Sequence, residues 1–152
     1  MQELSVTRLI AASPETVYRV WTTRTSEWFA PLPWKAPVVE QDFRAGGRSY
    51  VEMEGPDGTR MPGDGVILEV VPNEKIVFTD AFKVGWEPQE AFMVAIVTFE
   101  PEAGGTRYTA RVRHWSEEAL KRHQEMGFET GWGQVTAQLA ELAEAEEEAA
   151  AV

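Results

Sequence analysis

The chain has 152 residues, of which 43% are hydrophobic and 11% aromatic, and this length and composition fit one globular domain with a sizeable core. It contains no cysteine, which excludes thiol catalysis and cysteine-ligated zinc and is compatible with a reducing compartment. Twenty-five acidic against fourteen basic residues give a formal net charge of −11, which disfavours nucleic acid and anionic membrane surfaces as partners.

No segment of the sequence is suited to crossing or entering a membrane. The longest uninterrupted apolar run, residues 91–97, is far shorter than the roughly 18 residues that a spanning helix requires. The first 13 residues lack a basic segment followed by an apolar one, so they do not resemble a secretory signal. We therefore expect no membrane span and a cytoplasmic location.

The first forty residues predict one strand and two short helices. Residues 6–12 place apolar side chains on both faces of an extended segment, which favours a strand covered at least partly on both faces. Ser13 followed by Pro14 is typical of a helix start, because serine caps the first N–H groups and proline has none to lose. A second, shorter helix is expected near residues 25–29. The passage that follows cannot be regular helix because it contains Pro31, Pro33 and Pro37.

The middle of the chain predicts an antiparallel meander. Each apolar run is followed within about 8 to 12 residues by a cluster of Gly, Pro, Asn or Asp, the residues that form tight turns. With the first strand, the meander gives a sheet of seven strands. The expected strands cover residues 38–43, 48–54, 63–71, 75–82, 90–100 and 106–115.

Two helices are expected at the C-terminal end. Ser116 opens a short one that runs to about residue 125, and Gly127 interrupts it. In the longer helix, one stripe contains Phe128, Trp132, Val135, Leu139 and Leu142. The residues expected to face outward are Gln134, Thr136, Gln138 and Glu141. Beyond residue 142 the apolar face ends, so we expect one domain over residues 1–143 and a frayed, solvated acidic Ala/Glu tail over residues 144–152.

These elements predict an α+β protein in which a curved seven-stranded antiparallel sheet wraps around a long C-terminal helix. Several local strings resemble those of one family within the START-like helix-grip superfamily. They include Arg8-Leu9-Ile10, Trp28-Phe29, Asp42-Phe43-Arg44-Ala45-Gly46-Gly47, Pro56-Asp57-Gly58, Thr98-Phe99-Glu100 and Met126-Gly127-Phe128 with Gly131-Trp132. The family is similar to the C-terminal domain of the activator of the ninety-kilodalton heat-shock protein ATPase. The resemblance covers about residues 5–143.

The resemblance implies a helix-grip fold with an apolar cavity between the sheet and the long helix. Relatives in the superfamily bind lipids, sterols or aromatic polyketides, and some are cyclases. The family shares no catalytic residue set, so the resemblance assigns no catalytic residue to this chain. The co-chaperone for which the family is named contacts the heat-shock ATPase through a separate N-terminal domain, which nothing in this sequence matches.

Eight residues are candidates for contact with a small hydrophobic or aromatic ligand. They combine apolar walls with a few polar groups, which is typical of small-molecule sites, although core packing is the favoured explanation for any single aromatic residue. The candidates are Trp28, Asp80, Phe82, Trp86, Met93, His114, Phe128 and Trp132.

Two polar candidates are expected to point inward. His114 shares the register of Tyr108 and Val112, and Asp80 shares that of Phe78. Each has a functional and a structural interpretation: His114 as an acid, base or ligand contact or as a hydrogen-bonded histidine, and Asp80 as an abnormal acid or as the partner of a cation. His123 lies in a charged helix and is expected to be exposed.

Three hypotheses follow for function. The first is a binding protein for a small hydrophobic molecule, without cofactor, metal or catalytic residues, and present as a monomer or weak homodimer. The second is a cyclase- or hydrolase-type enzyme using His114 and Asp80. The third is a protein-interaction module, chaperone-related or homodimeric, using Trp86 in the flexible-looking segment 84–88. Metal and dinucleotide sites are not supported, since no complete ligand set or glycine fingerprint is present.

Overall fold

Seven antiparallel strands form the main sheet of the computed structural model, which describes residues 2–151. The strand order across the sheet is β1-β9-β8-β5-β4-β3-β2, so β1 and β2 are the edges. The strands are β1 (Glu3–Ile10), β2 (Lys35–Gln41), β3 (Arg48–Glu54), β4 (Arg60–Val71), β5 (Lys75–Thr79), β8 (Met93–Glu102) and β9 (Gly105–His114). The predicted α+β class and seven-stranded antiparallel sheet are confirmed.

One predicted strand is divided by a turn. Residues 75–82 were expected to be continuous, but β5 ends at Thr79, whose hydroxyl accepts a hydrogen bond from the Ala81 N–H and donates one to the Met93 carbonyl. The chain then enters a separate two-stranded sheet of β6 (Phe82–Lys83) and β7 (Glu87–Pro88). Phe82, which was expected in the same strand as Phe78, therefore lies in the smaller sheet.

The short helices begin at the predicted caps. The Ser13 hydroxyl accepts from the Thr16 N–H at the start of α1 (Pro14–Thr23), and the Ser116 hydroxyl accepts from the Ala119 N–H at the start of α3 (Glu117–Glu125). A single turn, α2 (Thr25–Trp28), follows α1. Gly127 has a φ of 91°, which only glycine adopts readily, and it separates α3 from the long helix α4 (Phe128–Ala150).

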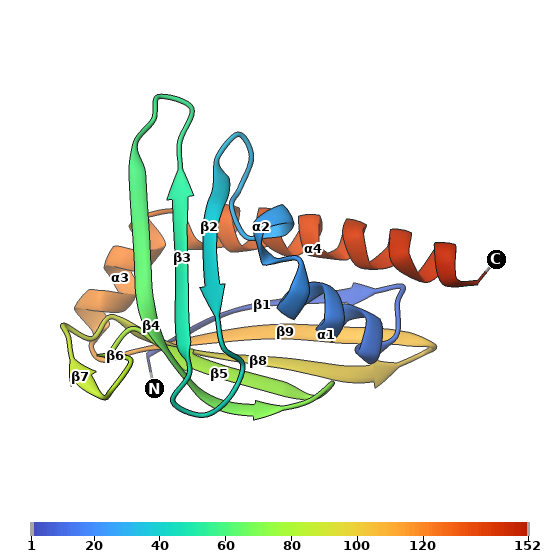
Figure 1. The fold of residues 1–152 in the computed structure, drawn as a ribbon, viewed down its shortest axis with the longest axis horizontal. Helices are drawn as coiled ribbons and strands as arrows, with labels where there is room; N and C mark the ends of the chain where they lie inside the picture. Colours follow the sequence, from blue (N-terminus) through green and yellow to red (C-terminus); the bar gives the residue numbers. More distant parts are fainter. Residues whose placement is uncertain (1, 152) are drawn as a thin grey trace.

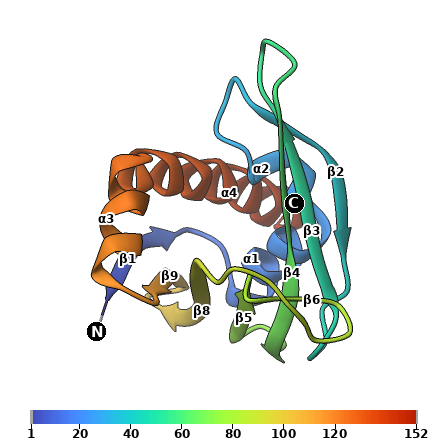
Figure 2. The same ribbon diagram turned by 90° about the vertical axis from the view of Figure 1, so that its left-hand side faces the viewer.

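The sheet curves around α4. In Figure 1, α4 extends across the molecule along one face of β1, β9 and β8. In Figure 2, seen from the end, β2, β3 and β4 rise as a second wall, and α4 lies in the angle between the two parts of the sheet. The main core fills that angle and includes Val17, Trp21, Phe99, Tyr108 and Leu139.

Two expectations about α4 are wrong. Thr136 and Gln138 were expected to face outward, but Thr136 is buried, and Gln138 donates to the carbonyl oxygens of Trp28 and Ala30. The tail is not frayed: Glu147 accepts from the Ser13 N–H at 2.6 Å, and Glu146 forms ion pairs with Arg19 and Arg24. Glu147 thus meets the N-terminal end of α1, and Glu146 meets arginines farther along α1 and at its C-cap, partners that the tail sequence alone does not show.

Candidate functional site

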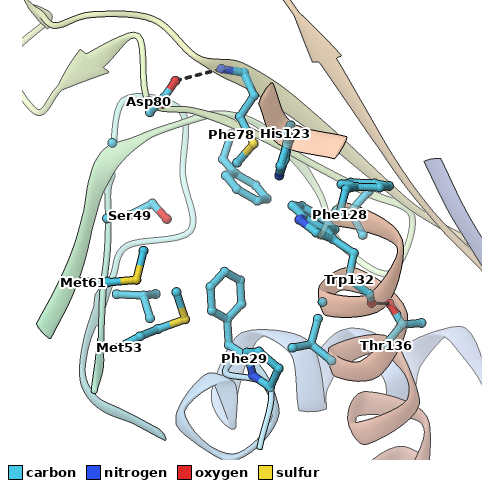
Figure 3. Close-up of a pocket in the computed structure, with 18 of the residues that line it drawn as sticks. Phe29, Ser49, Met53, Met61, Phe78, Asp80, His123, Phe128, Trp132 and Thr136 are labelled. Atoms are coloured by element: carbon cyan, nitrogen blue, oxygen red, sulfur yellow. Dashed lines mark hydrogen bonds between the residues drawn. The ribbon is translucent and has the colours of Figure 1, made fainter. Parts of the chain in front are cut away.

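A cavity of about 370 Å³ lies between the sheet and the first turns of α4 (Figure 3). One wall comes from β3 and β4 and carries Val51, Met53 and Met61, and the opposite wall comes from α4 and carries Phe128 and Trp132. Phe29 and Phe78 contribute further rings to the lining. The lining is therefore mainly apolar and rich in aromatic and methionine side chains, which suits an apolar molecule.

Three glycines belong to the cavity lining, and one of them borders open space. Gly131 lines the cavity from α4, and a Cβ atom added there would meet no other atom within 4 Å. Gly63 and Gly65 line it from β4. A Cβ atom at Gly65 would clash with the Thr79 backbone and one at Gly63 would contact the Val51 carbonyl oxygen, so of these three positions only Gly131 leaves open space for want of a side chain.

The cavity has a solvent-accessible rim. Met61 is 44% exposed and Met126 is 63% exposed, and both belong to the lining. They lie on opposite sides, in β4 and in the link between α3 and α4. Unbranched methionine side chains change rotamer readily, so the shape of this rim is adaptable.

Most polar side chains in the lining already have partners. Asp64 pairs with Arg48, and the Thr136 hydroxyl donates to the Trp132 carbonyl. The Asp80 carboxylate accepts from the N–H groups of Phe92 and Met93 at 3.0 and 3.1 Å. Asp80 was expected to meet a cation, but its partners are backbone amides, because the turn after β5 brings it to the start of β8.

Two histidines form a buried pair at one end of the cavity. His114 Nε2 and His123 Nδ1 are 2.8 Å apart, and both side chains are less than 8% exposed. Burial lowers the pKa of His114, and burial together with the neighbouring His114 lowers the pKa of His123 to about 4. Both rings are therefore neutral at pH 7.

The expected exposure of His123 is wrong. Its ring centroid lies 5.0 Å from those of Phe92 and Phe128, so the imidazole is enclosed by aromatic rings. The spacing of Ala119 and His123 is the sequence signal for this burial, since residues four apart on a helix share a face. The charged residues around His123 in the sequence led to the expectation that it is exposed.

The structure places five of the eight candidate residues in the cavity lining: Trp28, Asp80, Met93, Phe128 and Trp132. His114 is not part of the lining, but it forms a hydrogen bond with His123, which is. Phe82 and Trp86 lie elsewhere: their rings pack on each other at 5.8 Å in the β6–β7 hairpin, and Trp86 is 56% exposed. Sequence reasoning missed Met53, Met61 and His123, whose positions in the lining depend on the curvature of the sheet and the placement of α3.

The Asp80–His114 pair required by the enzyme hypothesis does not form a hydrogen bond. Asp80 is bound to backbone amides, and His114 is bound to His123. Within residues 2–151 there is also no group of three or more His, Asp or Glu side chains arranged to hold a metal. Over the same range, no helix is long and apolar enough to cross a membrane.

The comparisons with known proteins identify the family. The family model described as Activator of Hsp90 ATPase homolog 1-like protein (AHSA1) matches residues 11–144. The chain belongs to the AHSA1 family. The family and helix-grip fold implied by the sequence resemblance are thus confirmed, whereas no curated protein matches the AHSA1 chain significantly.

Several solved structures resemble this AHSA1-family chain over nearly its whole length. The crystal structure of protein NE0264 from Nitrosomonas europaea has 34% sequence identity and a TM-score of 0.91, and the match covers 96% of each chain. Protein Ms6760 from Mycobacterium smegmatis has 27% identity and a TM-score of 0.79, covering 93% of this chain and 90% of that one. A solution structure from Arthrobacter aurescens has 25% identity and a TM-score of 0.82, covering 93% and 86%.

Proposed function

We propose that this AHSA1-family chain binds a small apolar molecule in the cavity between the sheet and α4. The observation that carries the proposal is the cavity itself, about 370 Å³ in volume and lined by aromatic and methionine side chains. Cavities of this size and composition are typical of ligand sites in single domains. The formal net charge of −11 favours a neutral ligand over an anionic one. We further propose a cytoplasmic location, which a chain without cysteine suits.

Native mass spectrometry of the protein purified gently from its own source tests the proposal directly. We expect a small apolar molecule at stoichiometric occupancy, identified after denaturing extraction. A panel of lipids, sterols and aromatic compounds is then screened for a rise in melting temperature, since a ligand that binds only the folded state stabilises it. An unperturbed protein mass together with no stabilising compound would contradict the proposal.

Two glycines in α4 offer a matched pair of variants. A Cβ atom added at Gly131 or at Gly133 meets nothing within 4 Å, but only Gly131 lines the cavity. We expect Gly131→Leu to fill the space and weaken binding of a stabilising compound at least tenfold. Gly133→Leu gains the same helix propensity and should bind as the unmodified protein does. Equal affinities for the two variants would place the ligand outside the cavity.

A second candidate function, self-association, is favoured by one surface feature. Trp86 and Val84 are 56% and 51% exposed in the β6–β7 hairpin, an unusual exposure for a tryptophan beside another large apolar side chain. We propose a weak homodimer through this hairpin. Light scattering should show concentration-dependent association that Trp86→Ala removes; a monomer at all concentrations would contradict it.

A further inference from the structure

The His114–His123 pair leaves one hydrogen-bonding atom directed at the cavity. His114 Nδ1 lies 3.4 Å from the carbonyl oxygen of Gln2, which can only accept, so the proton of the neutral His114 ring is on Nδ1. His114 Nε2 must then accept from the Nδ1–H of His123 at 2.8 Å. The neutral His123 ring has no second proton, and its Nε2 is left as an acceptor.

His123 Nε2 has no hydrogen-bond partner within residues 2–151, and His123 belongs to the cavity lining. Figure 3 shows the ring extending from α3 into the cavity, with a nitrogen at its tip between Phe78 and Trp132. The burial that lowers the pKa of His123 to about 4 keeps this atom unprotonated at neutral pH. This end of the cavity therefore presents a neutral acceptor among aromatic rings.

The indole N–H of Trp132 is a hydrogen-bond donor close to the His123 ring. The ring centroids of His123 and Trp132 are 6.3 Å apart, and no group within the described chain accepts from the Trp132 indole N–H. In Figure 3 the indole nitrogen of Trp132 faces the cavity at the same end as His123. Phe128 stacks on the Trp132 ring at 5.3 Å and 29°, which fixes its orientation.

We infer that the ligand is a neutral, mainly apolar alcohol or phenol whose hydroxyl group donates to His123 Nε2 and accepts from Trp132 Nε1–H. A hydroxyl group can satisfy both atoms at once, because it has one donor and free lone pairs. A carboxylate or an ether has no proton for His123, and an ammonium group has no lone pair for Trp132. The inference rests on the proposed function, since it names the chemical class of the molecule in the same cavity.

Three probes of one shape test the inference: 2-naphthol, which has the hydroxyl group; 2-methoxynaphthalene, which has only the acceptor; and naphthalene, which has neither. Binding is measured by isothermal titration calorimetry at pH 7. We expect the unmodified protein to bind 2-naphthol about tenfold more tightly than 2-methoxynaphthalene, because one hydrogen bond to His123 separates them.

Two variants remove one polar atom each and keep an aromatic ring. His123→Phe should reduce the preference for 2-naphthol to about one while changing naphthalene affinity by less than about twofold. Trp132→Phe should weaken 2-naphthol and 2-methoxynaphthalene about equally, since both use the donor. The Trp132 variant and the unmodified protein remain informative if His123→Phe does not fold.

Imidazole nitrogen NMR supplies an independent measurement on the unmodified protein. We expect unprotonated Nε2 and protonated Nδ1 for His123, with the Nε2 resonance shifting when 2-naphthol binds and not when naphthalene binds. The opposite His123 tautomer would overturn the inference.

The outcomes separate the two proposals. Binding of all three probes without a hydroxyl preference contradicts the hydroxyl inference and leaves the proposed function standing. Loss of the preference in Ser49→Ala but not in His123→Phe also overturns it, because Ser49 lies on the opposite wall in β3. Failure of every probe to bind contradicts the proposed function, and the hydroxyl inference with it.

Discussion

The two halves of α4 face different surroundings. Residues 128–136, the cavity half, line an open space with Phe128, Gly131 and Trp132. Residues 137–150, the packed half, bury Leu139, Ala140 and Ala143 completely. The packed half also binds the start of α1 through glutamate side chains, whereas no side chain fills the space beside Gly131.

The difference assigns separate roles to one continuous helix. Close packing supplies stability, because each buried carbon both leaves water and gains contacts. Side chains that border a cavity contribute less stabilisation from packing, but they leave space that another molecule can occupy. Substitutions should therefore act on unfolding in the packed half and on ligand binding in the cavity half.

The largest expected effect is that of Leu139→Ala in the packed half. Leu139 is 0% exposed, and its truncation should cost about 3 kcal/mol of unfolding free energy, because the surrounding core closes only partly over the space. Urea denaturation measures the loss. The control is Val135→Ala in the cavity half, which should cost about 1 kcal/mol since Val135 already borders open space. Equal losses would remove the distinction between the halves.

Mild acid should lower the free energy of unfolding through His123, at one end of the cavity. The folded-state pKa of His123, about 4, is below its ordinary value of 6.5, so between these pH values the unfolded chain binds more protons. The contribution of His123 to stability is therefore complete above about pH 6.5 and is lost as pH falls toward 4, with a loss of about 2 kcal/mol between pH 7 and pH 5.

Denaturation at pH 7 and pH 5 measures this loss, which His123→Phe should reduce. The packed half provides the contrast, because its Arg24 hydrogen bond lowers the pKa of Glu146 below the ordinary 4.5. The stability that the Glu146–Arg24 hydrogen bond contributes is lost only at lower pH, as Glu146 takes up a proton. The unmodified protein and the His123→Phe variant share this contribution. An unchanged loss between pH 7 and 5 in His123→Phe would show that other groups cause it.

The smallest expected effect is that of Glu146→Gln. Its carboxylate lies 3.1 Å from Arg19 and 2.9 Å from Arg24, and partly exposed pairs of this kind are worth about 0.5 kcal/mol. Thermal denaturation at low and high salt should show a small loss that salt reduces. Glu148→Gln is the control, because Glu148 is exposed and forms no ion pair within residues 2–151. Equal effects of the two substitutions would mean that the docking of the tail adds no stability.

Much of the fold was predictable because its signals are local. Ser13 and Ser116 cap helices through bonds to residues three positions away, and the turn clusters delimit the strands of the sheet. The inward direction of His114 followed from the period of two in β9. Phe128 and Trp132 were likewise predictable candidates, because the apolar stripe of α4 directs them toward the sheet.

The sequence by itself therefore determined the seven antiparallel strands, the capped helices, the apolar stripe of α4 and the family. Only the tertiary structure decided the partners of Asp80, the His114–His123 pair, the volume and full lining of the cavity, and the docking of the tail on α1. Each of these depends on groups brought together from separate elements, such as residues 114 and 123 or 13 and 147. Such contacts are set by the curvature of the sheet and the path of α4, and no local pattern of residues specifies either one.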